Sequence, residues 1–205
     1  GLQVLGSGDG LHPGWRRMWQ ESPDDGSGIL VVPTGEVEDR DRVHHLILLE
    51  SWEDFERLGD RLGQDRARFR NSGRPRVDLG GEAIAEQVHA LGGLVGPAHA
   101  FTPWTSLYAS FDRVAACYGA EPIDFLELGL SADSSYGAGI GELRGVPFLT
   151  NSDAHSPSPV RLGREFTRLS VRDLTCRDVL ESVRKGSVVM NAGFFPEEGK
   201  YNRTA

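Results

Sequence analysis

Short, almost wholly apolar runs alternate with amphipathic segments along most of the chain, and this alternation restricts the fold more than any other feature of the sequence. Such runs are typical of strands that are covered on both faces. We predict strands at 29–33, 43–49, 94–98, 124–129, 147–151, 166–170 and 187–190. Helices are expected from Ser51 to about Leu62 and over 81–91, 107–118 and 174–185. This order of elements predicts an α/β fold with a parallel barrel or sheet.

The length of the chain favours one globular unit. Its 205 residues, 39% of them hydrophobic, suffice for one sizeable core, and no repeat, linker or low-complexity tract divides them. We therefore expect a single domain over residues 1–205. The first residues are typical of a strand that runs straight into a glycine-rich loop, without an initiator methionine, so we expect the chain to be cut from a longer protein.

Charge and cysteine content bear on partners and compartment. The net charge of −8 would repel a nucleic-acid backbone unless basic residues gather on one face or metal ions offset the acid. Cys117 and Cys176 lack CxxC spacing, so we expect two buried apolar fillers in a reducing compartment. No apolar run reaches the roughly 20 residues that span a bilayer, and no signal peptide is evident, so a soluble, cytoplasmic protein without membrane contact is expected.

Two short motifs pair a carboxylate with an imidazole. Asp153 and His155 are two residues apart after an apolar run, so on extended chain both side chains point to one side and could chelate a metal ion. Asp9 and His12 lie in a glycine-rich loop that could turn both toward a common ion. In each case the alternative is an ordinary hydrogen-bonded turn.

Further candidates accompany the apolar runs 29–32 and 43–49. Glu36 follows the first of these runs, and its carboxylate could bridge two ions. Glu38 and Asp39 are interpreted as solvated. His44 and His45 are neighbours in a predicted strand and must point to opposite faces; we favour His45 for the site and place His44 behind it.

Three more ionisable residues need an interpretation. His99 ends a short apolar strand, where a buried ring needs a partner; the alternative is a lone core histidine. Glu127 lies inside an apolar strand, which is costly for a carboxylate unless it is paired or bound to metal. His89 is mid-helix and is interpreted as an ordinary surface histidine.

Together these candidates supply nitrogen and oxygen donors without a thiolate, which suits a cluster of zinc or manganese ions. The predicted ligands are Asp9, His12, Glu36, His45, His99, Glu127, Asp153 and His155. Sites with several metal ions hydrolyse phosphoesters, because one ion activates water while another holds a phosphate oxygen. We therefore expect phosphoester cleavage in which Asp153, His155 and Glu36 are catalytic.

Basic residues offer candidate phosphate contacts. Residues 66–76 contain five arginines and end in glycine and proline breakers, which predicts a basic surface loop; its alternative is a merely solvated one. Arg161 and Arg164 follow the Asp153–His155 motif and are predicted to bind substrate. Phe101 and Trp104 could stack on a base, but such aromatics pack in cores more often, so we leave them out of the site.

The ordered motifs resemble those of PHP (polymerase and histidinol phosphatase) domains. Within that superfamily, the stretches 6–15, 43–49, 96–104, 125–133 and 148–157 are similar to the endonuclease Q family. The resemblance implies a distorted (β/α)7 barrel, here without the first strand and its His-x-His pair. It also implies two or three zinc ions, with manganese or magnesium as alternatives.

By the same resemblance, the expected partner is DNA containing deaminated bases, nicked on the 5′ side of hypoxanthine or uracil after the base is extruded. The cysteine zinc-binding segment and the C-terminal structure that follow in that family are absent here. One alternative is a phosphatase of a small phosphomonoester. Another is a non-catalytic PHP module of a larger DNA-processing protein.

Overall fold

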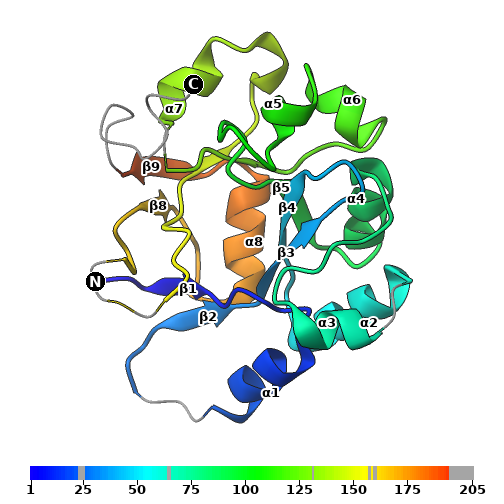
Figure 1. The fold of residues 1–205 in the computed structure, drawn as a ribbon. Coiled ribbons are helices and arrows are strands. Elements are labelled where there is room, and N and C mark those ends of the chain that lie inside the picture. The colour runs from blue at the N-terminus through cyan, green and yellow to red at the C-terminus, as the bar shows by residue number, and fades with distance from the viewer. Residues whose placement is uncertain (23–25, 64–65, 131, 157, 159–160, 194–205) are drawn as a thin grey trace.

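The computed structural model describes residues 1–22, 26–63, 66–130, 132–156, 158 and 161–193, and it confirms the α/β class (Figure 1). The strands are β1 Val4–Gly6, β2 Leu30–Val32, β3 Thr34–Glu38, β4 His44–Leu48, β5 Leu94–Pro97, β6 Leu126–Glu127, β7 Phe148–Leu149, β8 Phe166–Leu169 and β9 Val188–Ala192. The helices are α1 Pro13–Glu21, α2 Trp52–Arg61, α3 Arg66–Asn71, α4 Gly81–His89, α5 Leu107–Ser110, α6 Val114–Tyr118, α7 Ser134–Ala138 and α8 Cys176–Arg184, with a 3-10 turn at Gly141–Leu143.

The sheet β3–β4–β5 is antiparallel throughout, so the prediction of parallel strands is wrong for it. Residues 39–43 join β3 to β4, and a parallel crossover needs about a dozen residues or more. The Asp39 carboxylate closes this turn by accepting the amide hydrogens of Asp41 at 2.9 Å and Val43 at 2.8 Å. The pair β4–β5 is antiparallel although α2, α3 and α4 intervene, so alternation of elements does not determine strand direction here.

The remaining strands form separate pairs. β1 pairs with β2 and β6 with β7, both in parallel, whereas β8 pairs with β9 in antiparallel fashion. Among the described residues the strands therefore make four small sheets rather than one closed barrel. In Figure 1, α8 lies in the middle of the molecule, between the β3–β5 sheet and the side that carries β1, β2 and β8.

Several helical segments differ from the sequence prediction, among them α7, which was not predicted. The unpredicted α1 has Pro13 at its start, and the His12 ring accepts the amide hydrogen of Trp15 at 3.1 Å as its cap. The basic stretch 66–76 was expected to be a loop, but α3 forms within it. The helix predicted over 107–118 is divided into α5 and α6, because the distant Glu142 carboxylate accepts the Val114 amide at the start of α6.

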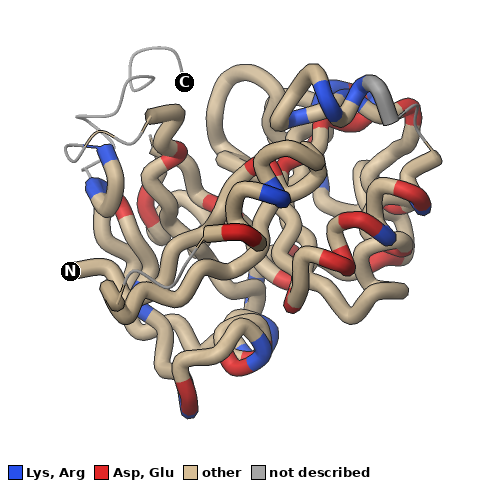
Figure 2. Tube along the Cα trace, turned by 90° about the horizontal axis from the view of Figure 1, so that it is seen from below, with Lys and Arg blue, Asp and Glu red and all other residues tan. Residues whose placement is uncertain are grey.

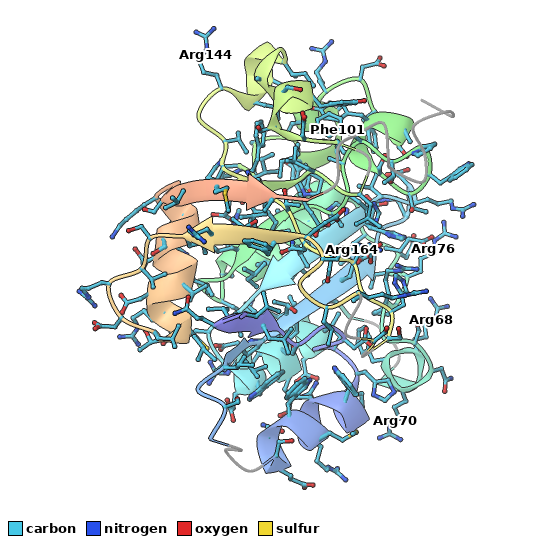
Figure 3. All side chains as sticks on the ribbon, turned by 90° about the vertical axis from the view of Figure 1, so that its left-hand side faces the viewer. Arg68, Arg70, Arg76, Phe101, Arg144 and Arg164 are labelled. Carbon is cyan, nitrogen blue, oxygen red and sulfur yellow. The ribbon has the colours of Figure 1, made fainter. Side chains whose placement is uncertain are left out.

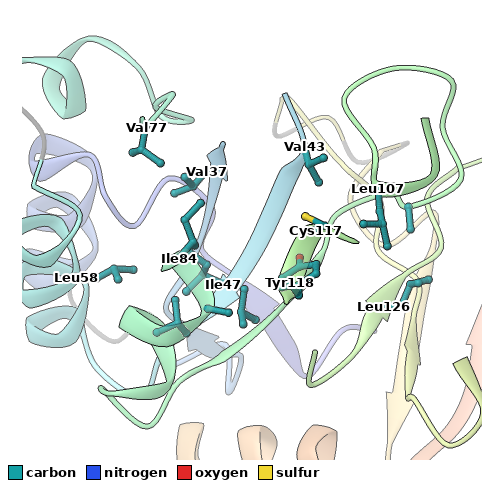
Figure 4. Close-up of a cluster of buried hydrophobic side chains, with 14 of the residues drawn as sticks. Val37, Val43, Ile47, Leu58, Val77, Ile84, Leu107, Cys117, Tyr118 and Leu126 are labelled. Carbon is teal, nitrogen blue, oxygen red and sulfur yellow. The ribbon is translucent and has the colours of Figure 1, made fainter. Parts of the chain in front are cut away.

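Two groups of buried apolar side chains hold these elements together. In the larger group, Ile84 and Val88 of α4 pack with Ile47 of β4 and with side chains from α2 and α6 (Figure 4). In the second group, Val179 and Val183 of α8 pack against residues of β2, β4, β5 and β7. β4 contributes to both groups, which fixes its position between them. Within the described residues, no helix is both long and apolar enough to cross a membrane.

Candidate metal centre

One carboxylate and two imidazoles from three parts of the fold converge on one point. Glu36 lies on β3, His44 begins β4, and His99 lies two residues after β5. His44 Nδ1 is 2.7 Å from Glu36 Oε1 and 3.1 Å from His99 Nε2. His99 Nε2 is 3.7 Å from the same Glu36 oxygen. The three donor atoms thus form a small, closed triangle.

The register of the hairpin explains why His44, and not His45, reaches this point. Glu36 is opposite Leu46 and Glu38 is opposite His44, so His44 shares a sheet face with both carboxylates. His45 points to the other face, where its ring is wholly buried. The expectation that His45 faces the site with His44 behind it is therefore reversed in the structure.

The Glu36 carboxylate and the His99 ring shift each other's pKa values. Burial by itself would raise the pKa of Glu36, but hydrogen bonds and charge from His44 and His99 hold it well below its usual range. Burial would lower the pKa of His99, yet the hydrogen bond to Glu36 and the charges of Glu127, Glu36 and Asp153 raise it. The Glu36 carboxylate is therefore ionised in a pocket of imidazoles, as a metal ligand must be.

The donor set fits a divalent cation such as zinc. Ligands of a tetrahedral zinc ion with bonds of about 2.0–2.1 Å lie roughly 3.3 Å apart, and the observed separations of 2.7, 3.1 and 3.7 Å bracket that value. The buried His44 Nε2 makes no hydrogen bond within the described part of the chain, and Glu38 Oε2 is 3.4 Å away from it. Glu36, His44 and His99 form one of the groups in the described residues that could hold a metal ion.

Glu127 links two loops at the cluster. It ends β6 and is 7% exposed; one carboxylate oxygen accepts the His99 amide hydrogen at 2.8 Å and the other accepts from the Asn151 side chain at 2.6 Å. Burial raises the pKa of Glu127, although the His99 charge and the Asn151 hydrogen bond lower it. Its contacts show that Glu127 positions the His99 loop and the start of the 151–155 segment.

The Asp153–His155 motif follows β7 but is not extended. Asp153 has a φ of 45°, so the expectation of two side chains projecting from extended chain is wrong. The charge of the exposed Asp153 carboxylate contributes, after Glu36 and Glu127, to raising the pKa of His99. The His155 side chain is 65% exposed, and its Nδ1 lies 2.9 Å from the Asp153 carbonyl oxygen and 3.6 Å from Oδ1.

The Asp9–His12 motif does not belong to the Glu36–His44–His99 triangle. Both ring nitrogens of His12 have partners: Nδ1 caps α1, and Nε2 is 2.9 Å from the Arg70 carbonyl oxygen. The structure thus shows His12 as a helix cap that also holds α3. The Asp9 carboxylate is exposed and lies over Gly73, where an added carbon would be 2.2 Å from Asp9 Cγ.

Backbone strain marks several of these residues. A positive φ is uncommon outside glycine and concentrates at functional sites. Among the described non-glycine residues, the positive values are those of Asp9 at 50°, Arg42 at 68°, His99 at 32°, Thr105 at 55° and Asp153 at 45°. Three of these five residues were predicted as ligands from the sequence. Asp9, His99 and Asp153 lie in three separate loops, each of which is held in an unfavourable conformation.

A second group of buried polar residues lies on the other face of β4. Asp39 is wholly buried, which contradicts its interpretation as a solvated residue. His45 Nε2 is 3.1 Å from Asp39 Oδ2, and His45 Nδ1 is 2.7 Å from the hydroxyl of Tyr118. Burial raises the pKa of Tyr118, so this phenol keeps its proton and donates it to His45, which leaves Nε2 to donate to Asp39. The three groups satisfy one another, and we interpret them as a structural network.

The two cysteines differ from each other. Cys117 is buried beside this network, as expected, whereas Cys176 is only partly buried. Burial and the charges of Asp39 and Asp41 raise the pKa of Cys117 to about 12. Its sulfur is therefore a protonated, apolar filler.

Arginines approach the cluster from two sides. Arg74 Nη1 is 3.2 Å from Glu36 Oε1, a contact that the sequence did not single out within 66–76. Arg164 Nη2 donates to the Ser152 carbonyl at 3.1 Å and so braces the residue before Asp153. Arg161 is exposed on the following turn. Side-chain spacing gave no signal for Arg74, because the contact depends on how segment 73–77 lies along β3.

Three residues that were left out of the site also have defined positions. His89 at the end of α4 is half-buried between two carboxylates, 2.6 Å from Glu121 and 3.0 Å from Asp124, so the expectation of an ordinary surface histidine is wrong. Phe101 stacks on Tyr108, as expected of a core aromatic. Trp104, by contrast, is 61% exposed.

Comparison with solved structures supports an endonuclease Q-like fold. The chain superimposes on the lesion-specific endonuclease PfuEndoQ from Pyrococcus furiosus with a TM-score of 0.90 and 41% identity, over 98% of this chain and 52% of that one. It also superimposes on an endonuclease Q in complex with a 27-mer duplex substrate carrying an abasic lesion at the active site, with a TM-score of 0.90 and 40% identity, over 98% of this chain and 54% of that one.

Two curated proteins, both uncharacterised, are similar in sequence. YqxK of Bacillus subtilis is 33% identical over 170 residues, which are 80% of this chain and 43% of the relative. MJ0043 of Methanocaldococcus jannaschii is 47% identical over 110 residues, which are 51% of this chain and 14% of the relative. No protein-family model matches the chain. The chain spans about half the length of the solved structures and less of the curated relatives.

Proposed function

We propose that this chain carries the metal-dependent hydrolytic site of a DNA-repair endonuclease of the endonuclease Q type, which nicks DNA on the 5′ side of deaminated bases such as hypoxanthine and uracil. The observation that carries the proposal is the Glu36–His44–His99 triangle, within a chain that matches lesion-specific endonucleases at a TM-score of 0.90. A second support is that the endonuclease Q solved with DNA holds its abasic lesion at the active site.

We further infer a PHP-type domain whose complete form is a distorted (β/α)7 barrel. Glu36, His44 and His99 would hold a zinc ion, with manganese or magnesium as alternatives. Asp153, with its charge near His99, is the fourth candidate ligand. His155, Asp9 and Glu127 remain candidates, and His12 would have to leave its two present partners in order to join them. A bound ion of this kind supplies Lewis-acid activation of water and of the phosphoryl group.

Other residues of the chain would hold the loops around the ion and contact the substrate. Glu127 holds the His99 amide and the Asn151 side chain, so it fixes the two loops between which a phosphate would lie. Arg164 braces the Ser152 carbonyl, and Arg161 is exposed beside it for contact with a neighbouring phosphate. The exposed Asp153 and His155 would face the reacting phosphodiester.

The experiment uses the full-length protein with added zinc, manganese or magnesium and a duplex that contains one deoxyinosine, beside an undamaged duplex of the same sequence. A nick on the 5′ side of the lesion that is lost in Glu36→Gln and Asp153→Asn would support the proposal. Absence of a nick together with release of phosphate from small monoesters would favour the phosphatase instead. His89→Ala is the matched control, since His89 and its partners Glu121 and Asp124 do not belong to the Glu36–His44–His99 group.

A further inference from the structure

Tyr136 on α7 holds an aromatic ring in solvent close to the His99 loop. Its side chain is 42% exposed, although most large apolar residues in the described part of the chain are buried or half-buried. The Tyr136 ring centroid is 6.0 Å from that of Phe101, which comes two residues after His99 in the sequence. Tyr136 therefore extends the surface of the candidate metal centre with an aromatic side chain.

Phe101, against which Tyr136 lies, is fixed relative to His99. The Thr102 amide and the Thr102 hydroxyl both donate to the His99 carbonyl, each at 3.0 Å, so the loop turns tightly around Phe101. The Tyr108 ring stacks on the Phe101 ring with a centroid distance of 5.3 Å and an interplanar angle of 15°. The aromatic pair of Phe101 and Tyr136 is thus held by the fold, and little ordering is needed before it binds a ligand.

α7 also packs on the strand that leads to Asp153. An added carbon at Gly137 would lie 2.3 Å from the Phe148 ring, so the helix is in close contact with β7. β7 ends four residues before Asp153. Tyr136 is therefore connected to the His99 loop through Phe101 and to the Asp153 segment through β7.

The surface around Tyr136 is uncharged. Residues 134–141 contain one glutamate fewer than any charged stretch would need, namely none, and no lysine, arginine or aspartate. The chain as a whole has a net charge of −8, and acidic residues are spread over its trace (Figure 2). Along the vertical of Figure 3, Phe101 lies between Arg164 and Arg144. The acidic charge that repels a polyanion elsewhere is therefore absent from the residues next to the Tyr136 ring.

We propose that Tyr136, backed by Phe101, is the stacking surface for a base that leaves the duplex when DNA binds at the metal centre. The proposal rests on the proposed function and deepens it by naming a positioning residue for the substrate. Every nucleobase has a flat π-face, so aromatic side chains stack on unpaired bases of any sequence. A base inside the duplex is already stacked on its neighbours, so the contact favours DNA from which one base is extruded.

The test compares two duplexes that differ in a single base. One contains deoxyinosine, and the other contains an abasic site at the same position, the lesion that the endonuclease Q solved with DNA holds at its active site. Binding to the full-length protein is measured by fluorescence anisotropy, with a chelator present so that no strand is cut. Loss of one base–aromatic stack weakens binding by about 5- to 150-fold. We expect such a loss for Tyr136→Ala on the deoxyinosine duplex and no loss on the abasic duplex, which has no base to stack.

Two control variants accompany Tyr136→Ala. Tyr136→Phe keeps the ring and should bind both duplexes as the wild type does. Met18→Ala removes a side chain that is 61% exposed on α1 and should also leave both affinities unchanged. The unfolding midpoints of all variants are compared first.

Three results would overturn the stacking surface while lesion-dependent nicking by the wild type still upheld the nuclease. They are wild-type affinity of Tyr136→Ala for the deoxyinosine duplex, an equal loss of affinity for the abasic duplex, and a loss in Tyr136→Phe as large as in Tyr136→Ala. A wild type that neither binds nor nicks DNA would overturn the proposed function and the stacking surface with it.

Discussion

The two adjacent histidines of β4 should respond in opposite ways to the same substitution. His45→Ala removes a wholly buried ring that joins the Asp39 carboxylate to the Tyr118 hydroxyl. His44→Ala removes a ring of the candidate metal centre, where Glu36 is 21% exposed and keeps its contact with Arg74. We therefore expect His45→Ala to lose stability and His44→Ala to lose bound metal.

The size of the stability effect follows from the groups left behind. In His45→Ala, a buried carboxylate oxygen and a buried phenol each lose a hydrogen-bond partner, at about 1–3 kcal/mol apiece, so the free energy of unfolding should fall by roughly 2–6 kcal/mol. At about 2–4 °C per kcal/mol for a chain of this size, the melting temperature should fall by at least about 4 °C. Tyr118→Phe, which removes one hydroxyl without a cavity, should cost about 1–3 kcal/mol.

The assay combines thermal unfolding of the metal-free proteins with metal content measured by plasma mass spectrometry after loading with zinc. If His45→Ala does not fold, Tyr118→Phe supplies the stability measurement. The reasoning would be refuted by a His45→Ala protein that loses metal at an unchanged melting temperature, while His44→Ala retains its metal. That result would mean that His45, as predicted from the sequence, is the metal ligand and His44 is not.

Three further results are expected. Asp153→Asn should abolish nicking and leave the melting temperature within a few degrees, because the side chain is exposed; full activity would remove Asp153 from the site. Gly35→Ala should destabilise by about 1–3 kcal/mol, since the added carbon would lie 2.8 Å from Phe55, whereas Gly139→Ala, in open space, should be nearly neutral in the same denaturant titration. Cys117, with its pKa raised to about 12, should resist alkylation at pH 8 until the protein unfolds; rapid labelling of the folded protein would contradict this.

The sequence predicted strand and helix positions better than it predicted their directions. Apolar runs identified β4, β5 and α8 to within a few residues, because burial alone determines such patterns. The stretch 34–38 contains glycine and two glutamates, so it lacks the apolar signature of a strand, and the hairpin that it forms with β4 was missed. α3 was missed for a related reason. Its arginines are typical of a solvated loop, and the burial of Phe69, which anchors the helix, has no signal in the sequence.

The candidate site was predictable as a set of residue types and not as an arrangement. The sequence selected Glu36, His99 and Glu127 as candidates, and the structure brings these three residues together, although Glu36 lies in the middle of β3 and not after a strand end. Choosing between His44 and His45 required the register of β3 against β4, which depends on the turn closed by Asp39. A hairpin with one more or one fewer residue in that turn would exchange the faces of the two histidines.

Backbone conformation supplies an argument that is independent of the side-chain distances. Asp9, His99 and Asp153 lie in three different loops, and each adopts a positive φ that costs free energy for a residue other than glycine. Aspartate and histidine are among the residue types that tolerate this conformation best, but glycine would tolerate it at less cost. At His99 the strain is held by the Glu127 carboxylate on its amide, so part of the fold maintains it. Glycine would relieve this strain, so the side chains of Asp9, His99 and Asp153 are retained at a cost in stability.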